Sequence, residues 1–456
     1  PWSSRNSGGR ALRTKLRVRQ MGLSPGSPPC EEVALQKPGL SGEVASQKPS
    51  RSLEEVKQHS RREDCWLVLY GEVYDLTAYV PFHPGKDFLL QAAGTDATGL
   101  FESIHSSSGK ALLRSEGFHS RYHVGQLADG QNDFTFDDPL YQEISAGVAA
   151  HFREVKGTSW ARGGPIERAV VYSKFVLILC LSALTKWRSV LGAGLFSSVL
   201  HGFCLLLVIF NISHGACHGE LILRYPTWFS RASQMLHRMI GTSAKDWMAW
   251  HNLSHHQHTN TNKDLDTNRG KPFFRLHEHD PLCGYMRYQH IYIWFIYPLT
   301  HLSTFVQRQA RSALIYALAC NVLSCCLTGQ SCLLALLVES LTFGFGFVMI
   351  NHITHANDET EYHHHPGGKI GWGEHQIRSS SNWCMGNPLV LALWGGINYQ
   401  IEHHMFQSIH HVHYPALSRL VQSACAKRGV PYITFPTYLS ALASHHRLLV
   451  RMGVPP

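Results

Sequence analysis

The chain has 456 residues, more than one domain usually holds, and its net charge of +9 fits a membrane protein with basic cytosolic surfaces. Its 12 cysteines include no C-x-x-C pair, which argues against a zinc site or a disulfide framework, and no stretch interleaves aromatic with basic residues as nucleic-acid binding would require. The unusual feature is the 31 histidines, most of which follow residue 200.

The first 50 residues are rich in proline, glycine, serine and basic side chains and show no hydrophobic periodicity. A segment of this composition cannot bury enough apolar surface to fold, so residues 1–50 are predicted to be disordered. They also lack the apolar core of a signal peptide, and the N-terminus is therefore expected to stay in the cytosol.

Residues 51–128 are predicted to form a small α+β domain. A helix with a capping serine is followed by two short strands, residues 65–70 and 71–76, around a turn. Further along, His83 and His105 each lie on a turn beside apolar residues. Two imidazoles placed in this way can hold a flat macrocycle from opposite sides, and bis-histidine ligation leaves haem iron no open position. The pattern therefore indicates electron transfer rather than oxygen binding.

The motifs of this segment resemble a cytochrome b5 domain. The resemblance is carried by Trp66, residues 71–76, His83-Pro84-Gly85, residues 94–98 and Phe101-Glu102. It implies that residues 51–128 bind haem b, with His83 and His105 as the axial ligands. The family usually has two glycines after His-Pro, whereas here Lys86 follows a single Gly85, which shortens the interval between the two ligands.

A linker is predicted at residues 129–164, in which residues 141–152 are a candidate amphipathic helix lying on the membrane. Four apolar segments long enough to cross a bilayer then follow in two pairs: residues 169–187 and 190–212, and residues 312–329 and 331–350. Between the pairs, residues 289–305 are rich in aromatic side chains and interrupted by Pro298, which indicates an interfacial or half-inserted segment.

Two membrane hairpins would place the histidine-rich segments after residue 212 on one side of the membrane. If the N-terminus is cytosolic, the first hairpin returns the chain to the cytosol near Ser213 and the second near Asn351. We therefore predict an α-helical membrane protein with four transmembrane helices and a cytosolic helical cap at residues 165–440, and a C-terminal tail at residues 441–456. Both termini are expected to be cytosolic.

Histidines cluster in three places on that cytosolic side. The clusters are His214 and His218; His251, His255 and His256; and His403 and His404. In a helix, Gln400, His403 and His404 stand at i, i+3 and i+4, so their side chains point from one face. Neutral imidazoles bind divalent transition metals well. Three clusters on one side of the membrane therefore indicate one shared metal centre.

The number of imidazoles indicates two ions, because the clusters supply seven and one ion uses three or four. The second hairpin ends in the segment from Asn351 to His355, which adds His352, His355 or both. Zinc is disfavoured, because a haem domain would have no purpose beside a redox-inert metal. We expect two iron ions, and iron paired with a one-electron donor implies reductive activation of O₂.

The clusters resemble the histidine boxes of the membrane fatty-acid desaturase superfamily, in particular front-end desaturases fused to cytochrome b5. The resemblance extends from residue 51 to about residue 425 and includes residues 372–376 and 398–404. Gln400 takes the place of the first histidine of the third box, which is the front-end hallmark. The second box is H-x-x-x-H-H, where front-end enzymes mostly have H-x-x-H-H, and this departure points to the cytochrome b5-related branch.

The resemblance implies a fold with four spans, an acyl-chain tunnel and a cytosolic di-iron centre. The metal ligands are then expected among His214, His218, His251, His255, His256, His352, His355, His403 and His404. Gln400 and Asn351 are candidate catalytic side chains. The Gln400 amide can hold a metal-bound water or coordinate weakly through oxygen. Asn351 and His355 match an Asn-x-x-x-His site of the family, while front-end members resemble Asn351-His352 directly.

The implied function is O₂-dependent desaturation of a lipid acyl chain, in acyl-CoA or a phospholipid, by a multi-pass protein of the endoplasmic reticulum membrane. Electrons would arrive singly through the haem from an NADH-cytochrome b5 reductase, and no nucleic acid is expected as a partner. Two alternatives stay open. One is a lipid or sphingolipid hydroxylase with the same di-iron chemistry. The other is a catalytically silent haem and metal protein that acts as an electron-transfer or regulatory partner of another desaturase.

Overall fold

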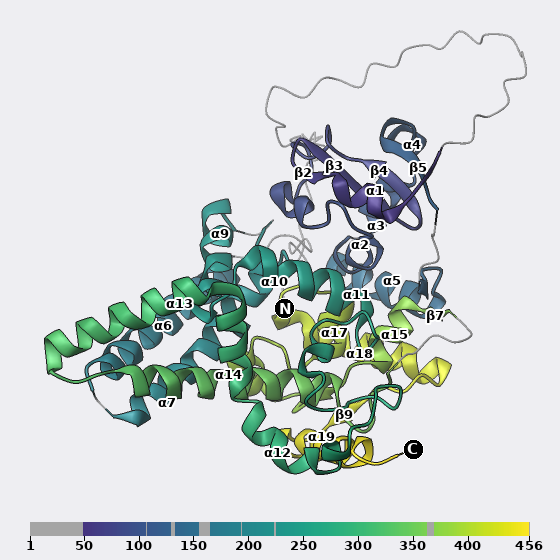
Figure 1. The fold of residues 1–456 in the computed structure, drawn as a ribbon. Helices are drawn as coiled ribbons and strands as arrows, with labels where there is room; N and C mark the ends of the chain where they lie inside the picture. Colours follow the sequence, from purple (N-terminus) through teal and green to yellow (C-terminus); the bar gives the residue numbers. More distant parts are fainter. Residues whose placement is uncertain are drawn as a thin grey trace, which may run out of the picture. The chain divides into compact units, whose positions relative to one another are not determined.

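The structure is a computed structural model and describes residues 49–105, 107–128, 133–154, 165–192, 194–222, 225–362 and 369–455. Most of the segment predicted to be disordered, residues 1–50, and part of the predicted linker therefore lie outside the described residues. Within the described ranges, an α+β domain precedes a larger helical body (Figure 1).

The N-terminal domain is built on a five-stranded sheet. Its strands, in the order β1-β5-β4-β3-β2, are β1 Ser50–Arg51, β2 Ser60–Arg61, β3 Asp64–Leu69, β4 Glu72–Asp75 and β5 His123–Leu127. The predicted hairpin is present as β3 and β4, and its turn at Tyr70 and Gly71 has positive φ at both residues, 57° and 82°, as a type I′ turn requires. Strand β5 pairs with β4 from the far end of the domain, a long-range contact that local pattern did not reveal.

Short helices pack with this sheet around an apolar core. They are α1 Leu53–Gln58, the 3-10 helix η1 Lys86–Gln91, α2 Thr98–Ile104, α3 Ser107–Leu113 and α4 Glu116–Tyr122. The predicted helix cap is present, since the Ser52 hydroxyl accepts a hydrogen bond from the backbone N–H of Glu55 at 3.1 Å. Leu67, Leu76 and Leu100 are buried in the core, which fixes α2 against the sheet.

Four long helices run alongside one another in the body (Figure 1): α6 Pro165–Val190, α7 Leu195–Val208, α13 Leu299–Thr328 and α14 Leu333–His355. Three described stretches are long and apolar enough to cross a membrane, Arg168–Val190, Leu195–Cys217 and Leu333–His355, whereas the apolar stretch described in α13, Leu314–Thr328, is shorter. Gly329, with φ of 71°, ends α13 where the sequence predicts a break. Three of the four predicted spans therefore have the length and composition of a membrane helix.

These long helices expose large apolar side chains on their outer faces. Examples are Val176 and Leu177 on α6, Phe196 on α7, and Ile315 and Leu318 on α13. Soluble proteins rarely expose contiguous apolar surface of this extent, whereas lipid tails would cover it at no cost to the backbone hydrogen bonds of a helix. The exposed faces therefore indicate a membrane protein.

Two π-helical turns occur at the first two histidine clusters. One, η2 Ile209–Ser213, joins α7 to α8 His214–Cys217; the other, η4 His251–His255, joins α10 Ala244–Trp250 to α11 His256–His258. In η4 the backbone N–H of His256 donates to the carbonyl of His251, five residues earlier. A π turn brings residues i and i+5 to one face. The H-x-x-x-H-H spacing can therefore bring His251 and His256 together despite its extra residue.

The remaining helices of the body are α5 Pro139–Glu154, α9 Thr227–Met235, η3 Leu236–Ile240, η5 Thr267–Gly270, η6 Gly284–Tyr288, α12 Gln289–Ile296, α15 Trp372–Arg378, α16 Pro388–Trp394, α17 Gln400–Met405, η7 His411–His413, α18 Tyr414–Arg428 and α19 Tyr438–Met452. Two short parallel ladders pair β6 Phe134–Thr135 with β7 Ile370–Gly371, and β8 Asn382–Trp383 with β9 Thr434–Phe435. Asn382 of β8 accepts a hydrogen bond from the backbone N–H of Ile401 at 3.0 Å, which positions the start of α17.

Two helices differ from the sequence-based predictions. Helix α5 contains the predicted amphipathic segment, but Tyr141, Ile144 and Val148 pack in the protein core with α18 instead of facing lipid. Helix α19 runs across residue 440, after which the sequence predicts a C-terminal tail, and it buries Leu448 and Leu449. In both helices the apolar face packs against a distant segment, which periodicity alone does not identify.

Candidate metal centre and haem pocket

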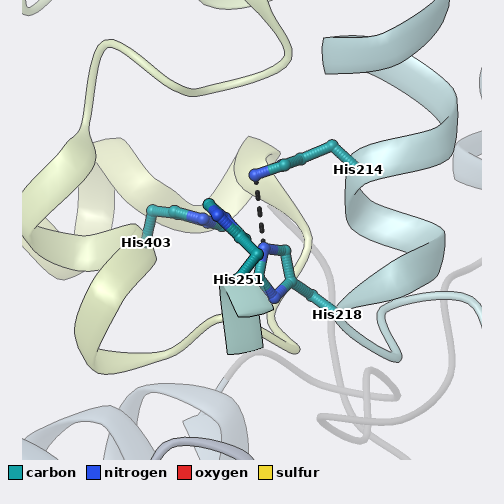
Figure 2. Close-up of side chains that lie close together, drawn as sticks. All are labelled: His214, His218, His251 and His403. Carbon is teal, nitrogen blue, oxygen red and sulfur yellow. Dashed lines mark hydrogen bonds between the residues drawn. The ribbon is translucent and has the colours of Figure 1, made fainter. Parts of the chain in front are cut away.

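Four buried histidines point toward one another in the body (Figure 2). His214 begins α8 and His218 caps it, while His251 comes from η4 and His403 from α17. One ring nitrogen of each lies within 4.8 Å of those of the other three, and the Nε2 atoms of His214 and His218 are 3.2 Å apart. Nitrogens that share one ion, each bound at about 2 Å, lie up to about 4 Å apart. The four imidazoles can therefore close on one metal ion with small adjustments.

A second group combines His255, His355 and His404, from η4, α14 and α17. Their ligand nitrogens also lie within 4.8 Å of one another. The Gln400 amide nitrogen is 2.8 Å from Nε2 of His355 and 3.2 Å from Nε2 of His404, while the amide oxygen is buried without a hydrogen-bond partner. A half-turn of the amide would direct this oxygen at the point where a cation could meet both imidazoles. Gln400 thus fits as a weak oxygen ligand of the second group.

His256 connects the two groups. Its Nε2 lies 3.2 Å from Nε2 of His251 in the first group, and its ring stacks on His404 of the second with centroids 4.1 Å apart. The structure thereby gathers all seven predicted cluster imidazoles, together with His355, in one buried site. Two adjacent groups of this kind correspond to a centre for two ions.

The outward ring nitrogens of five of these histidines are held by acceptors. Nδ1 of His218 lies 2.6 Å from Gln407 Oε1, and Nδ1 of His251 lies 2.6 Å from Asp266 Oδ2. Three more Nδ1 atoms lie 3.0 Å from an oxygen: that of His255 from Asp264 Oδ2, that of His355 from the Ser379 carbonyl, and that of His404 from Gln376 Oε1. Because these oxygens accept, Nδ1–H donates and the Nε2 lone pair points into the cluster. Nε2 of His403 is buried without a hydrogen-bond partner. Converging lone pairs in a dry site need a cation, so these residues fit two metal ions.

Burial keeps most of the cluster neutral. Burial, followed by the charges of neighbouring groups, chiefly other imidazoles, lowers the pKa of five rings well below the usual 6.5: His218, His251, His256, His403 and His404. The neutral imidazole is the form that binds a metal, so at neutral pH these rings have no proton to lose first.

Asp264 strengthens His255 as a ligand. Burial alone would raise the pKa of the Asp264 carboxyl, but the charge and hydrogen bond of His255 outweigh burial and bring that pKa to about 2. For His255 the balance is similar, since burial lowers its pKa and Asp264 more than reverses this, so that the pKa is raised. A carboxylate behind an imidazole makes the opposite nitrogen more basic toward a metal.

Two sequence-predicted site residues lie outside both metal groups. Nδ1 of His352 is 2.9 Å from the Tyr297 hydroxyl, which is itself 2.9 Å from Nε2 of His445. Asn351 and His352 line an adjoining cavity. Of the two histidines at the end of α14, the structure brings His355 to the cluster, while His352 faces the cavity and Tyr297.

The acceptors that orient the imidazoles were not among the site residues predicted from the sequence. Asp264 and Asp266 follow the second histidine cluster on the same loop, and Gln407 lies three residues beyond His404. Since metal-bound histidines usually donate their other N–H to a carboxylate or carbonyl oxygen, carboxylates and amides close to a histidine box are a usable signal.

A cavity of about 580 Å³ adjoins the metal groups. It is lined by Trp247, which stacks on the His251 ring with centroids 4.1 Å apart, and by Asp266. Its wall also includes the apolar side chains of Leu299, Phe343 and Phe347. The volume is typical of small-molecule sites. The cavity can therefore hold an apolar chain with part of it beside the metal groups.

A second cavity, of about 420 Å³, contains His83 and His105, whose ring centroids are 6.0 Å apart. Apolar side chains such as Leu67, Leu100 and Phe118 line it. Burial lowers the pKa of both imidazoles to about 4, so both are neutral at pH 7. An apolar slot between two neutral imidazoles fits a haem group.

The two candidate haem ligands are oriented differently. Nδ1–H of His105 donates to the Phe101 carbonyl at 3.2 Å, which leaves its Nε2 lone pair free for iron. Nδ1 of His83 instead accepts a hydrogen bond from the Gly85 N–H at 3.2 Å. His83 can therefore bind iron through Nε2 after its proton moves to Nδ1 and this hydrogen bond opens.

Two family models match the chain. The model of the fatty acid desaturase family matches residues 189–436, and that of the cytochrome b5-like haem/steroid binding domain matches residues 52–128. An acyl-lipid (8-3)-desaturase of Physcomitrium patens is 26% identical over 93% of this chain and 96% of its own length. Delta(5) fatty acid desaturase A of Dictyostelium discoideum is 25% identical over 89% of this chain and 94% of its own length.

Among solved structures, cytochrome b558 of Ectothiorhodospira vacuolata, a prokaryotic homologue of cytochrome b5, is 38% identical over 18% of this chain and 100% of its own, with a TM-score of 0.16. The desaturase match covers more than half of the chain and contains every histidine of the two metal groups. His83 and His105 lie within the second match. The chain therefore belongs to the fatty acid desaturase family and carries a cytochrome b5-like domain ahead of its desaturase part.

Proposed function

We propose that the protein is a membrane-bound fatty acyl desaturase of the front-end type, which uses O₂ to introduce a cis double bond into a lipid acyl chain. The observation that carries this proposal is the buried cluster of imidazoles beside a largely apolar cavity. Gln400 at the first position of the third box supports the front-end type. The relatives described above are named as fatty acid or acyl-lipid desaturases.

The side chains around the cluster prepare the site for this reaction. Two iron ions bound there would supply the oxidising power needed to break an unactivated C–H bond. Asp264, Asp266 and Gln407 fix the imidazoles, so little reorganisation is needed during turnover. The cavity wall orients the acyl chain past Trp247 and excludes bulk water from the reacting segment.

The cytochrome b5-like domain supplies the electrons in this proposal. His83 and His105 would hold haem b between their two imidazoles, and a group held in this way would supply single-electron transfer without binding O₂. The electrons reach the haem from an NADH-cytochrome b5 reductase, and the acyl substrate is an acyl-CoA or a phospholipid.

Lys86→Gly is expected to stabilise this domain. Lys86 has φ of 49°, a left-handed conformation that costs an L-residue about 1–2 kcal/mol. Glycine avoids this cost but gains freedom in the unfolded chain, so we expect the free energy of unfolding to rise by up to about 1 kcal/mol. Thermal unfolding followed by haem absorbance measures the change.

Lys86→Ala is the matched control. It removes the hydrogen bond from Lys86 Nζ to the Thr227 hydroxyl at 3.2 Å, as the glycine variant does, but it retains the left-handed backbone. Equal melting temperatures for the glycine and alanine variants would contradict the role assigned to φ.

Gln400→His is expected to leave the protein folded and iron-loaded but to lower turnover by about 10-fold or more. The imidazole would fill strongly a position that the amide fills weakly, and its second nitrogen would need a new partner in a buried site. Iron per protein and product formed are measured for both proteins. A fully active variant would show that the amide has no special role.

In our proposal the four long helices span the endoplasmic reticulum membrane and both termini are cytosolic. The helical run from α7 through α8 ends near His218, and α14 ends at His355. Both ends contribute histidines to one cluster, which supports two hairpins that return the chain to the same side of the membrane.

Glycosylation acceptor sites give a test of this topology. Acceptors inserted near Ser189, at the end of α6, and near Gln330, between α13 and α14, are expected to be modified in the lumen. An acceptor near Asn268, on the loop after the second histidine cluster, is expected to remain unmodified. Modification near Asn268 would place that cluster on the wrong side of the membrane.

The function is tested by product analysis. The protein is expressed in yeast fed with varied fatty acids, and lipids are analysed by mass spectrometry alongside a His403→Ala control. We expect a new double bond in one class of acyl chain. A hydroxylated product would identify a hydroxylase instead, and no product from protein that carries haem and iron would favour the silent electron-transfer or regulatory role.

A further inference from the structure

The geometry between the cytochrome b5-like domain and the first metal group points to a role for Gln407. We propose that Gln407 is a positioning residue that orients the ligand His218 and at the same time links it, through Ser103, to the helix that precedes the haem ligand His105. This inference rests on the proposed function, because it concerns the route by which haem electrons reach the metal groups.

The Gln407 side chain uses both ends of its amide. Its Oε1 accepts the Nδ1–H of His218 at 2.6 Å, and its amide nitrogen donates to the Ser103 hydroxyl. The hydroxyl in turn donates to the Leu100 carbonyl at 3.0 Å. His218, Gln407 and Ser103 are at most 1% exposed, so water does not compete for these bonds.

Ser103 lies in α2, two residues before His105. The connection from the haem ligand to the metal ligand therefore consists of a short piece of backbone, the Ser103 side chain, two hydrogen bonds and the Gln407 amide. On the metal side it ends at Nε2 of His218, 3.2 Å from Nε2 of His214.

Other amides hold the same domain against the histidine clusters. Gln257 contacts the backbone of Gly99 and Asp96, each at 3.1 Å, and Asn252 donates to Gln91 Oε1 at 2.9 Å. Gln257 and Asn252 follow His256 and His251 directly in the sequence, but these hydrogen bonds go to residues of the N-terminal domain and not to an imidazole. Gln407 differs because it bonds directly to a ligand imidazole.

The step served by this connection is a one-electron transfer. A haem held by His83 and His105 would give up one electron, from ferrous to ferric, and a metal ion held by the His218 group would take it up, from ferric to ferrous, with no proton moved. The bonds that Gln407 makes would keep His218 and α2 in fixed relative positions during each of the successive transfers.

Ser103→Ala tests the connection from the haem-domain side and leaves the bond between Gln407 and His218 in place. The haem of the full-length protein is reduced by dithionite without oxygen or substrate, and its reoxidation by the ferric metal centre is followed by absorbance and by electron paramagnetic resonance. We expect haem and iron contents equal to wild type and reoxidation slower by about 10-fold, the usual scale for loss of an outer partner.

Lys86→Ala is the control, because it also removes one hydrogen bond between the domain and the body, to the Thr227 hydroxyl, without touching Gln407. It is expected to transfer electrons at nearly the wild-type rate. Equal slowing in both variants would show that docking alone matters and would overturn the assigned route, as would an unchanged rate in Ser103→Ala.

Gln407→Leu tests the metal side. It should lose iron as well as slow electron transfer, because His218 loses the acceptor that orients it. Gln407→Glu keeps an oxygen that can accept the Nδ1–H of His218, although it loses the amide donor to Ser103, and should restore much of the iron. Full iron retention in Gln407→Leu would overturn the positioning role. Because these readouts need no product, wild-type protein that transfers electrons yet desaturates nothing would refute the proposed function and leave this inference standing.

Discussion

His404→Ala is expected to release iron from the purified protein and to abolish product formation, a loss larger than the 10–100-fold typical of removing an outer partner. His404 supplies a ligand nitrogen to the second metal group, 3.2 Å from the Gln400 amide. Its Nδ1 is held by Gln376 and by the Thr259 hydroxyl, at 3.0 and 3.1 Å. Alanine removes the ligand and also removes the buried Nδ1–H that Gln376 and Thr259 hold.

His445→Ala is the matched control for this experiment. His445 is as fully buried as His404, but it bonds to the Tyr297 hydroxyl and the Ala356 carbonyl rather than to the metal groups. Iron and haem per protein are measured for both variants. We expect the His445 variant to keep its iron, and iron retained by His404→Ala at the wild-type level would remove this residue from the ligand set.

His105→Ala is expected to abolish haem binding and, with it, turnover driven by NADH. Its Nδ1–H bond to the Phe101 carbonyl holds the imidazole in the cavity beside His83, and alanine leaves no ring nitrogen at this position. The iron content of the metal groups should stay unchanged, because their ligands all lie in the desaturase part. The absorbance spectrum of the haem, iron analysis and product formation separate these effects.

His119→Ala serves as the control within the same domain. His119 is half-buried on α4 and contacts the Tyr74 hydroxyl at 3.3 Å. The variant should bind haem with an unchanged low-spin spectrum. If His105→Ala still bound haem with that spectrum, a different residue would have to be the axial ligand.

Features fixed by local geometry could be predicted from the sequence. The β3–β4 hairpin depends on a turn with positive φ at Tyr70 and Gly71, a conformation that glycine adopts easily. The directions of Gln400, His403 and His404 depend on the helical repeat, and the structure indeed turns all three side chains into the buried cluster. In each example the determining residues lie within a few positions of one another.

The second histidine cluster shows the limit of this reasoning. Its spacing places His251 and His256 five residues apart, and in an α-helix such residues do not share a face. The π turn of η4 brings their Nε2 atoms to 3.2 Å. A π turn is uncommon in isolation. Here His251 and His255 are also held by Asp266 and Asp264 across the loop.

The sequence by itself determined three of the four predicted apolar spans, the turn of the hairpin in the N-terminal domain, and the common direction of Gln400, His403 and His404 on one helix. Only the tertiary structure shows that His352 and His355 lie in different surroundings: His352 contacts the Tyr297 hydroxyl, while His355 packs against His255 and His404. It also brought Gln407 to His218 across 189 positions of sequence. The spacing of residues in the sequence determines which way their side chains point within one helix or strand. Contacts between helices and strands depend instead on many weak packing interactions between distant segments, which the spacing does not encode.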